Sequence, residues 1–211
     1  MAKQEIAIKT QDGTARAGLF QPSHRPASEV PGVILYMDAF GPRPALDAMA
    51  ERLASEGYVV LLPDLFYRYG DYGPFDAQTA FSEEPSRTAL RGMIGDTTQD
   101  MTRRDSAAFL DALTQAGATG RIGTVGYCMG GSRAINAAAA YPDRIAAAAS
   151  FQPEQSAVLA QALRRAEIDH VIENYVGMAH GWAVPDSRVY DARGAERHWK
   201  RLLTFFDETL R

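Results

Sequence analysis

Polar and apolar side chains alternate in two stretches near the start of the chain, residues 5–9 and 15–20. Alternation with a period of two is typical of strands that bury one face, and Asp12-Gly13 between the stretches is typical of a tight turn. The pattern therefore predicts an antiparallel hairpin. Residues 21–31 contain three prolines and are expected to form a surface loop.

Two later stretches, residues 33–37 and 58–62, are apolar without interruption. Such runs are typical of strands that are buried on both faces of a sheet. Between them, residues 45–56 place apolar side chains at helical spacing and precede Gly57, a common residue just past a helix. The order strand, helix, strand predicts a right-handed crossover in a parallel sheet.

Residues 65–95 have no clean period and are rich in aromatic residues, glycine and proline. They follow the carboxyl end of a predicted strand, where open α/β sheets bind ligands, so we expect a long irregular functional segment. Residues 96–116 then predict an amphipathic helix. Beyond residue 140 the sequence predicts a strand at residues 144–151, a helix at 154–166 and a strand at 170–176. A loop at residues 177–190 and a helix at 195–210 follow.

These elements describe one α/β domain over residues 1–211, a mostly parallel sheet with helices on both faces. A net charge of −4 without a basic run argues against nucleic acid and anionic membranes as partners. The first ten residues lack the apolar core of a secretion signal, and no apolar run is long enough to span a bilayer. With a single cysteine, which excludes an internal disulfide, we expect a cytoplasmic protein.

The candidate chemistry centres on residues 121–140, RIGTVGYCMGGSRAINAAAA. A β-branched apolar run leads into a glycine-rich turn, and an alanine-rich helical pattern follows at once. The nucleophile-elbow motif G-x-S-x-G has this order, and its glycines keep Cβ atoms out of a tight turn. Here the central residue is Cys128. The positive end of the following helix favours its thiolate, and the Met129 N–H is placed for an oxyanion.

A structural interpretation of Cys128 stays open from this stretch alone. A lone cysteine is more often an inert buried residue than a nucleophile, and small-residue turns are common where a helix packs closely on a sheet. What favours the nucleophile is the combination of glycines on both sides with a strand before and a helix after.

Four histidines could serve as the general base for this thiol. His24 lies in the proline-rich loop, His170 precedes a predicted strand, and His198 lies beside charged residues on the last helix, where we expect a solvated face. His180 follows the last predicted strand, at the sheet edge onto which the elbow opens. It also has the position after the nucleophile that the motif's chain order requires.

The chain resembles the dienelactone hydrolase family, α/β-hydrolases with a cysteine nucleophile. The resemblance covers nearly the whole chain and rests on residues 36–41 (YMDAFG), 56–65 (EGYVVLLPDL), 126–131 (GYCMGG), 179–182 (AHGW) and 196–199 (ERHW). It implies the α/β-hydrolase fold and cleavage of a small-molecule ester or lactone. No cofactor is expected, and no metal is expected either, because no His/Cys/Asp cluster has the spacing of metal ligands. The chain is expected as a monomer or dimer.

By position, the resemblance implies that Cys128 attacks the carbonyl and that His180 is its base. The N–H groups of Ala39 and Met129 would form the oxyanion hole. Asp38 stands where the family often has a glutamate that contacts the resting thiol.

Two further positions concern the substrate. Arg68 matches an arginine that binds the substrate carboxylate in well-known members, whereas the second such arginine is Val184 here. Preference for a carboxylated dienelactone is therefore weakened, and a broader ester or lactone specificity becomes plausible.

The largest departure from the family lies between Phe151 and Glu154. Members have a loop, a further parallel strand and the catalytic aspartate there, so one late strand and the triad acid have no counterpart in this chain. Glu154 itself is a weak candidate to orient the histidine, and three poorer ones are Asp169, Glu173 and Asp186. Two other classes stay open: an impaired member that binds small molecules without turnover, and a redox-responsive thiol protein.

Overall fold

The computed structural model describes residues 3–23, 29–151, 156–173 and 175–211. Within these residues a six-stranded sheet has the order β1-β2-β4-β3-β5-β6. The hairpin predicted at the start of the chain is confirmed: β1 (Gln4–Thr10) and β2 (Gly13–Phe20) are antiparallel, with Gln4 opposite Leu19. β2 then pairs antiparallel with β4, which joins the hairpin to the parallel part of the sheet.

The parallel part consists of β4 (Val59–Pro63), β3 (Gly32–Tyr36), β5 (Ile122–Tyr127) and β6 (Ile145–Phe151). All residues of β3, β4 and β5 are buried, as the uninterrupted apolar runs predict for strands covered on both faces. Helix α1 (Pro44–Ser55) makes the predicted crossover from β3 to β4. The carboxyl ends of these strands therefore meet at one edge of the sheet.

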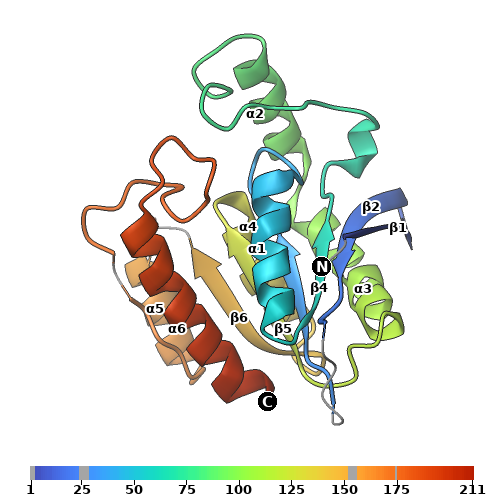
Figure 1. The fold of residues 1–211 in the computed structure, drawn as a ribbon, viewed down its shortest axis with the longest axis vertical. Coiled ribbons are helices and arrows are strands. Elements are labelled where there is room, and N and C mark those ends of the chain that lie inside the picture. Colours follow the sequence, from blue (N-terminus) through green and yellow to red (C-terminus); the bar gives the residue numbers. More distant parts are fainter. Residues whose placement is uncertain (1–2, 24–28, 152–155, 174) are drawn as a thin grey trace.

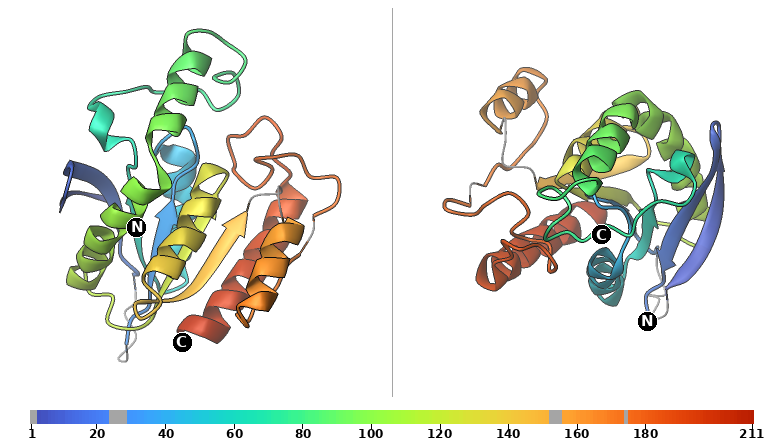
Figure 2. Two further views of the ribbon diagram at one scale, coloured as in Figure 1. Left: turned by 180° about the vertical axis from the view of Figure 1, so that it is seen from behind. Right: turned by 90° about the horizontal axis from the view of Figure 1, so that it is seen from above.

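Helices cover both faces of the sheet (Figures 1 and 2). α1 and α6 (Ala192–Leu210) lie on one face, where Arg52 of α1 packs over the Trp199 ring of α6. α3 (Gln99–Gln115) and α4 (Met129–Ala140) lie on the other. In the described part of the chain no helix is long and apolar enough to cross a membrane. The α/β fold class predicted from the sequence is confirmed.

The prediction that residues 65–95 are irregular throughout is wrong. A short 3-10 helix, η1 (Tyr67–Tyr69), follows β4, and α2 (Ser86–Asp96) forms before α3. α2 has a weak sequence signal because it contains two glycines and buries only two side chains, Leu90 and Met93. It projects above the carboxyl ends of the strands (Figure 1).

The strand predicted at residues 170–176 is also wrong, because none of the described residues in that range forms a strand. The resemblance places a further strand between β6 and this segment, and that strand has no counterpart here. The described residues of the segment do not pair with the open edge of β6. Among the described residues β6 is therefore the edge of the sheet. α5 (Ser156–Arg165), the helix after it, stands apart from the sheet in Figure 2.

His198 does not lie on a solvated face, as its charged neighbours had indicated. It is fully buried, and its Nε2 lies 2.8 Å from the hydroxyl of Tyr127, the last residue of β5. Its ring packs edge-on against Phe151 of β6, with centroids 4.1 Å apart. His198 thus fastens α6 to the two strands nearest the sheet edge.

Candidate active site

Cys128 lies between the end of β5 and the start of α4, as the elbow motif predicts. Its φ is 55° and its ψ is −123°, a conformation that residues with a side chain rarely adopt. The Cys128 N–H donates to the Phe151 carbonyl over 3.3 Å, and the Cys128 carbonyl accepts from the Gly131 N–H over 3.1 Å. Backbone strain at one residue in so regular a region is typical of a functional position.

The glycines around the cysteine are required by close backbone contacts. A Cβ on Gly126 would lie 1.9 Å from the Gly130 carbonyl oxygen, and a Cβ on Gly130 would lie 2.3 Å from the Tyr36 carbonyl oxygen. No side chain fits at either distance. α4 consequently packs directly against the ends of β3 and β5 and leaves Cys128 at the top of the sheet.

A cavity of about 490 Å³ opens at this edge, and Cys128, His180 and Asp38 all line it. The structure therefore brings together three of the residues that the sequence singles out. Figure 1 shows the loop at residues 177–190 and the segment before α2 on the same side of the sheet. The remaining lining is largely apolar and aromatic, and includes Phe40, Phe81, Tyr127, Phe151, Trp182 and Val184.

His180 is exposed, in a loop built from turns. No carboxylate of the described residues hydrogen-bonds to it, so the triad acid stays unassigned. Glu154, the weak candidate, lies outside the described residues. Of the poorer candidates, Glu173 pairs with Arg197 and Arg201 of α6, and Asp186 pairs with Arg43.

Asp38 is buried at the end of β3, and both of its oxygens accept hydrogen bonds. Oδ1 accepts from Arg43 Nη1 over 2.7 Å and from the Phe40 N–H over 3.0 Å, and Oδ2 accepts from Arg43 Nη2 over 2.9 Å. The guanidinium therefore neutralises this carboxylate beside the cavity. The contact with the Cys128 thiol that the resemblance implies for Asp38 stays a prediction.

The two residues expected to form the oxyanion hole come from different segments, the turn after β3 and the start of α4. Ala39 is buried and follows Asp38 after β3. Met129 is the first residue of α4, where backbone N–H groups have no acceptor within the helix. Their joint action on an oxyanion stays a prediction.

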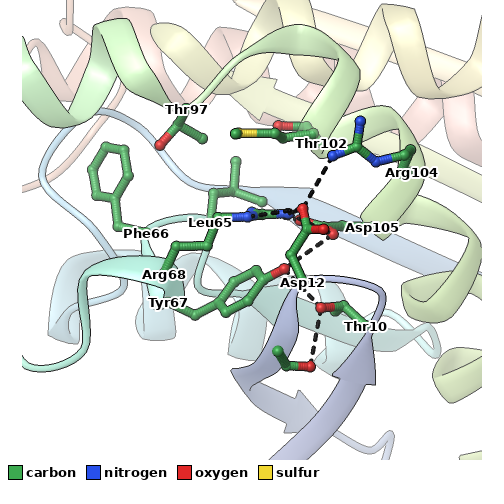
Figure 3. Close-up of polar contacts among 12 residues, drawn as sticks. Thr10, Asp12, Leu65, Phe66, Tyr67, Arg68, Thr97, Thr102, Arg104 and Asp105 are labelled. Carbon is green, nitrogen blue, oxygen red and sulfur yellow. Dashed lines mark hydrogen bonds and ion pairs between the residues drawn. The ribbon is translucent and has the colours of Figure 1, made fainter.

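Arg68 is not among the residues that line this cavity. Figure 3 shows it between Asp12 of the hairpin turn and Asp105 of α3, with its Nη2 2.6 Å from Asp12 Oδ2 and 2.9 Å from Asp105 Oδ1. It also stacks on the Tyr67 ring. These contacts tie the hairpin to α3, and the substrate role implied by the resemblance stays a prediction.

Sequence patterns do not single out Arg43, which lines the cavity, and the prediction of a solvated face for His198 is wrong. Arg43 gives no sequence signal because it stands in a Gly-Pro-Arg-Pro turn that has no period. His198 does give one: with Ala195, Trp199, Leu202 and Phe206 it has the spacing of one helix face, and all five are buried. That spacing predicts burial for His198 despite its charged neighbours.

Burial shifts the pKa of both members of the Tyr127–His198 pair. Desolvation raises the pKa of Tyr127 well above its ordinary value. Desolvation also lowers the pKa of His198 to about 4, against a weaker opposing effect of the Ala195 carbonyl. The imidazole beneath the elbow is therefore neutral at physiological pH.

Comparisons with known proteins agree with this architecture. A carboxymethylenebutenolidase of Pseudomonas sp. (strain P51) is 34% identical over 110 residues, which cover 52% of this chain and 44% of the relative. A candidate dienelactone hydrolase of Klebsiella pneumoniae subsp. pneumoniae has a solved structure that matches with a TM-score of 0.82 at 20% identity, over 98% of both chains. The latter shows a common fold.

The comparisons also bear on the missing segment. A candidate carboxymethylenebutenolidase of Yersinia pestis aligns over 246 positions, at 22% identity and over 97% of this chain and 87% of the relative, although this chain has only 211 residues. The chain spans only 41–59% of the length of the first curated relatives that it matches.

The model of the dienelactone hydrolase family matches in two parts, residues 16–160 and 153–210. The two parts meet where the sequence predicts a missing strand. Together they take in the elbow, Asp38 and His180. The chain belongs to the dienelactone hydrolase family.

Proposed function

We propose that this protein hydrolyses ester or lactone bonds through a covalent acyl-enzyme on Cys128, with His180 as the general base. The observation that carries the proposal is the backbone of Cys128, held at a φ of 55° between β5 and α4 at the mouth of a cavity that His180 also lines. A strained nucleophile, a base on the same cavity and a helix N-terminus behind the nucleophile are the parts that acyl transfer needs.

In the first half of the reaction, His180 takes the proton of the Cys128 thiol, and the thiolate attacks the carbonyl carbon. The carbonyl oxygen becomes an oxyanion that the N–H groups of Ala39 and Met129 stabilise, and each such donor is typically worth about 3 kcal/mol. The C–O bond then breaks, and the imidazolium returns its proton to the departing alkoxide. A thioester on Cys128 is left.

In the second half, His180 takes a proton from water, and the hydroxide attacks the thioester carbonyl. The C–S bond breaks, the acid product leaves, and the thiolate recovers its proton from the imidazolium. A thiol needs less help from its base than a serine hydroxyl, because a few per cent is already ionised at neutral pH. Cysteine at this position therefore suits a chain in which no triad acid is assigned.

The cavity favours uncharged or weakly charged substrates with an apolar or aromatic acyl group. Phe40, Phe81 and Phe151 are among the residues that line it, and Val184 takes the position of one family arginine. Arg43 is neutralised by carboxylates. The exposed Arg188 is the remaining lining cation.

The test is hydrolysis of 4-nitrophenyl acetate by the wild type and by the Cys128→Ala and His180→Gln variants, with intact mass recorded during turnover. We expect Cys128→Ala to abolish turnover, and we expect an acetyl adduct to form on the proteins that keep Cys128 but not on Cys128→Ala. We expect His180→Gln to lower kcat by about 10²-fold or more, the usual effect of losing a general base. Equal rates for wild type and Cys128→Ala would contradict the proposal and favour a binding protein.

A further inference from the structure

We infer that Arg43 and Asp186 form a clamp that holds the His180 loop, residues 177–190, against the elbow. The clamp is the chain Asp38–Arg43–Asp186, in which one guanidinium binds two carboxylates. This inference rests on the proposed function for its kinetic test, because Arg43 and Asp186 act there as positioning residues for His180.

All four carboxylate oxygens of the clamp accept hydrogen bonds from the Arg43 guanidinium group. Arg43 donates from Nε and Nη2 to the two oxygens of Asp186, over 2.6 and 2.8 Å, and from Nη1 and Nη2 to the two oxygens of Asp38, over 2.7 and 2.9 Å. Only 11% of its side chain is exposed, and its guanidinium also lies over the Phe40 ring. Because the guanidinium group is planar and donates two parallel hydrogen bonds to each carboxylate, it fixes the orientation of the carboxylates as well as their distance.

The effect of burial on Arg43 supports the same assignment. Desolvation alone would lower the pKa of this guanidinium, but the hydrogen bonds and charges of Asp186 and Asp38 outweigh it and raise the pKa. Arg43 is therefore a permanent positive charge. Its role is to connect two segments that are 143 residues apart in the chain.

The His180 loop depends on side-chain contacts for its position. In the described residues it is made of turns, and the strand expected just before it does not form. At its C-terminal end, Asp191 caps α6 through the Gly194 N–H and donates its own N–H to the Trp182 carbonyl. Between these points, the Arg43–Asp186 pair is the charged contact that joins the loop to the β3 side of the site.

The β3 side of the clamp is rigid. Asp38 is 3% exposed and directly precedes Ala39, the expected oxyanion donor. Arg43 thus connects the loop that carries the proposed base to the turn after β3 that carries Ala39. A displacement of about 1 Å between catalytic groups can cost about 10²-fold in rate, so such a link has a direct kinetic consequence.

The experiment removes the contact between Arg43 and Asp186. Asp186→Asn removes the charge that holds the loop but leaves the Arg43–Asp38 pair intact, so no buried carboxylate is left unpaired. Glu196→Gln is the matched control, because Arg52 binds Glu196 through two hydrogen bonds of 2.6 and 2.8 Å between α1 and α6, outside the cavity lining. Asp186→Glu restores the carboxylate with one more methylene.

We expect Asp186→Asn to lower kcat/KM by about 10- to 100-fold, mainly through kcat, since a misplaced base is felt in the transition state. Glu196→Gln is expected to stay within about twofold of the wild type. Asp186→Glu is expected to recover part of the lost kcat. Amide hydrogen exchange in residues 177–190 is expected to rise in Asp186→Asn and to stay at the wild-type level in Glu196→Gln.

Equal kinetics and equal exchange in Asp186→Asn and Glu196→Gln would overturn the clamp. A wild type without hydrolase activity would instead defeat the proposed function, and hydrogen exchange alone would then decide whether Asp186 holds the loop. A loss of kcat in Asp186→Asn that Asp186→Glu does not restore, without a change in exchange, would also contradict the clamp.

Discussion

The nucleophile and the base that we propose come from regions of the molecule that are held in place in different ways. Cys128 is positioned by backbone: β5 is buried along its whole length, and α4 touches the strand ends without room for a Cβ. His180 is positioned by side chains, through the Arg43–Asp186 pair and the packing of Trp182, whose ring lies 4.7 Å from that of Tyr175.

This difference predicts which region tolerates substitution and which does not. Backbone packing against backbone leaves no alternative arrangement, so the elbow is fixed as soon as the sheet forms. A loop held by a few side chains has lower local stability and opens more easily. The comparison predicts effects on the unfolding free energy that fall steeply from the elbow to the segment around residue 171.

The largest effect is expected at Gly126. In Gly126→Ala the new methyl would lie 1.9 Å from the Gly130 carbonyl oxygen and 2.7 Å from the Gly131 nitrogen, so α4 must move away from β5. We expect a loss of at least about 3 kcal/mol in the free energy of unfolding, measured by urea denaturation. Soluble expression would fall accordingly.

Gly92→Ala in α2 is the matched control for this substitution. Nothing lies within 4 Å of a Cβ built on Gly92, and alanine favours a helix, so this variant should gain up to about 1 kcal/mol. Equal stability of the two variants would show that α4 is free to shift, and the elbow would then be less rigid than the comparison requires.

Much of the backbone-positioned region could be predicted from the sequence. The uninterrupted apolar runs predict β3 and β4, and the glycines on both sides of Cys128 predict the elbow. In both cases the structure restricts which residues fit at consecutive positions, so the restriction is visible in a short stretch of sequence. The side-chain contacts of the His180 loop are not visible in this way. Arg43 and Asp186 meet across 143 residues, and nothing near either residue in the sequence indicates the other.

The errors have the same origin. The apolar pattern of residues 170–176 is suitable for a strand, but a strand also needs a hydrogen-bonded partner, and the described residues of this segment do not pair with β6. The prediction for His198 is wrong because it rests on the charged neighbours in sequence, Arg197 and Lys200, whereas the spacing of His198 with Trp199 and Leu202 determines its burial. A helix face is defined by spacing and not by adjacency.

The next largest effect is the loss of stability at acid pH that we expect from His198, whose ring is hydrogen-bonded to Tyr127 at the end of β5. The pKa of His198 is lowered to about 4 in the fold, against 6.5 for an ordinary histidine, so the unfolded chain binds the proton more tightly. The neutral ring's contribution is therefore complete above pH 6.5 and is lost as the pH falls toward 4. The loss amounts to about 3 kcal/mol.

Urea denaturation at pH 7 and at pH 4.5 measures this loss. We expect His198→Phe to be less stable than the wild type at pH 7, because Tyr127 loses its partner, but to lose less stability on acidification. His170→Gln, in the partly exposed segment after α5, should keep the acid loss of the wild type. An unchanged acid loss in His198→Phe would assign it to other groups.

The smallest effect is expected in the segment that has no place in the sheet. Val171 is 86% exposed, and Val176 in the same part of the chain is 91% exposed. Because Val171 has little contact area to lose, Val171→Ser should change the unfolding free energy by no more than about 0.5 kcal/mol. The same substitution at Val125 of β5, which is fully buried, removes a core side chain and buries a hydroxyl, and should cost about 2 kcal/mol or more. If Val171→Ser were as costly as Val125→Ser, the segment would be packed in solution against something, and the contrast between the buried strand β5 and this exposed segment would have to be abandoned.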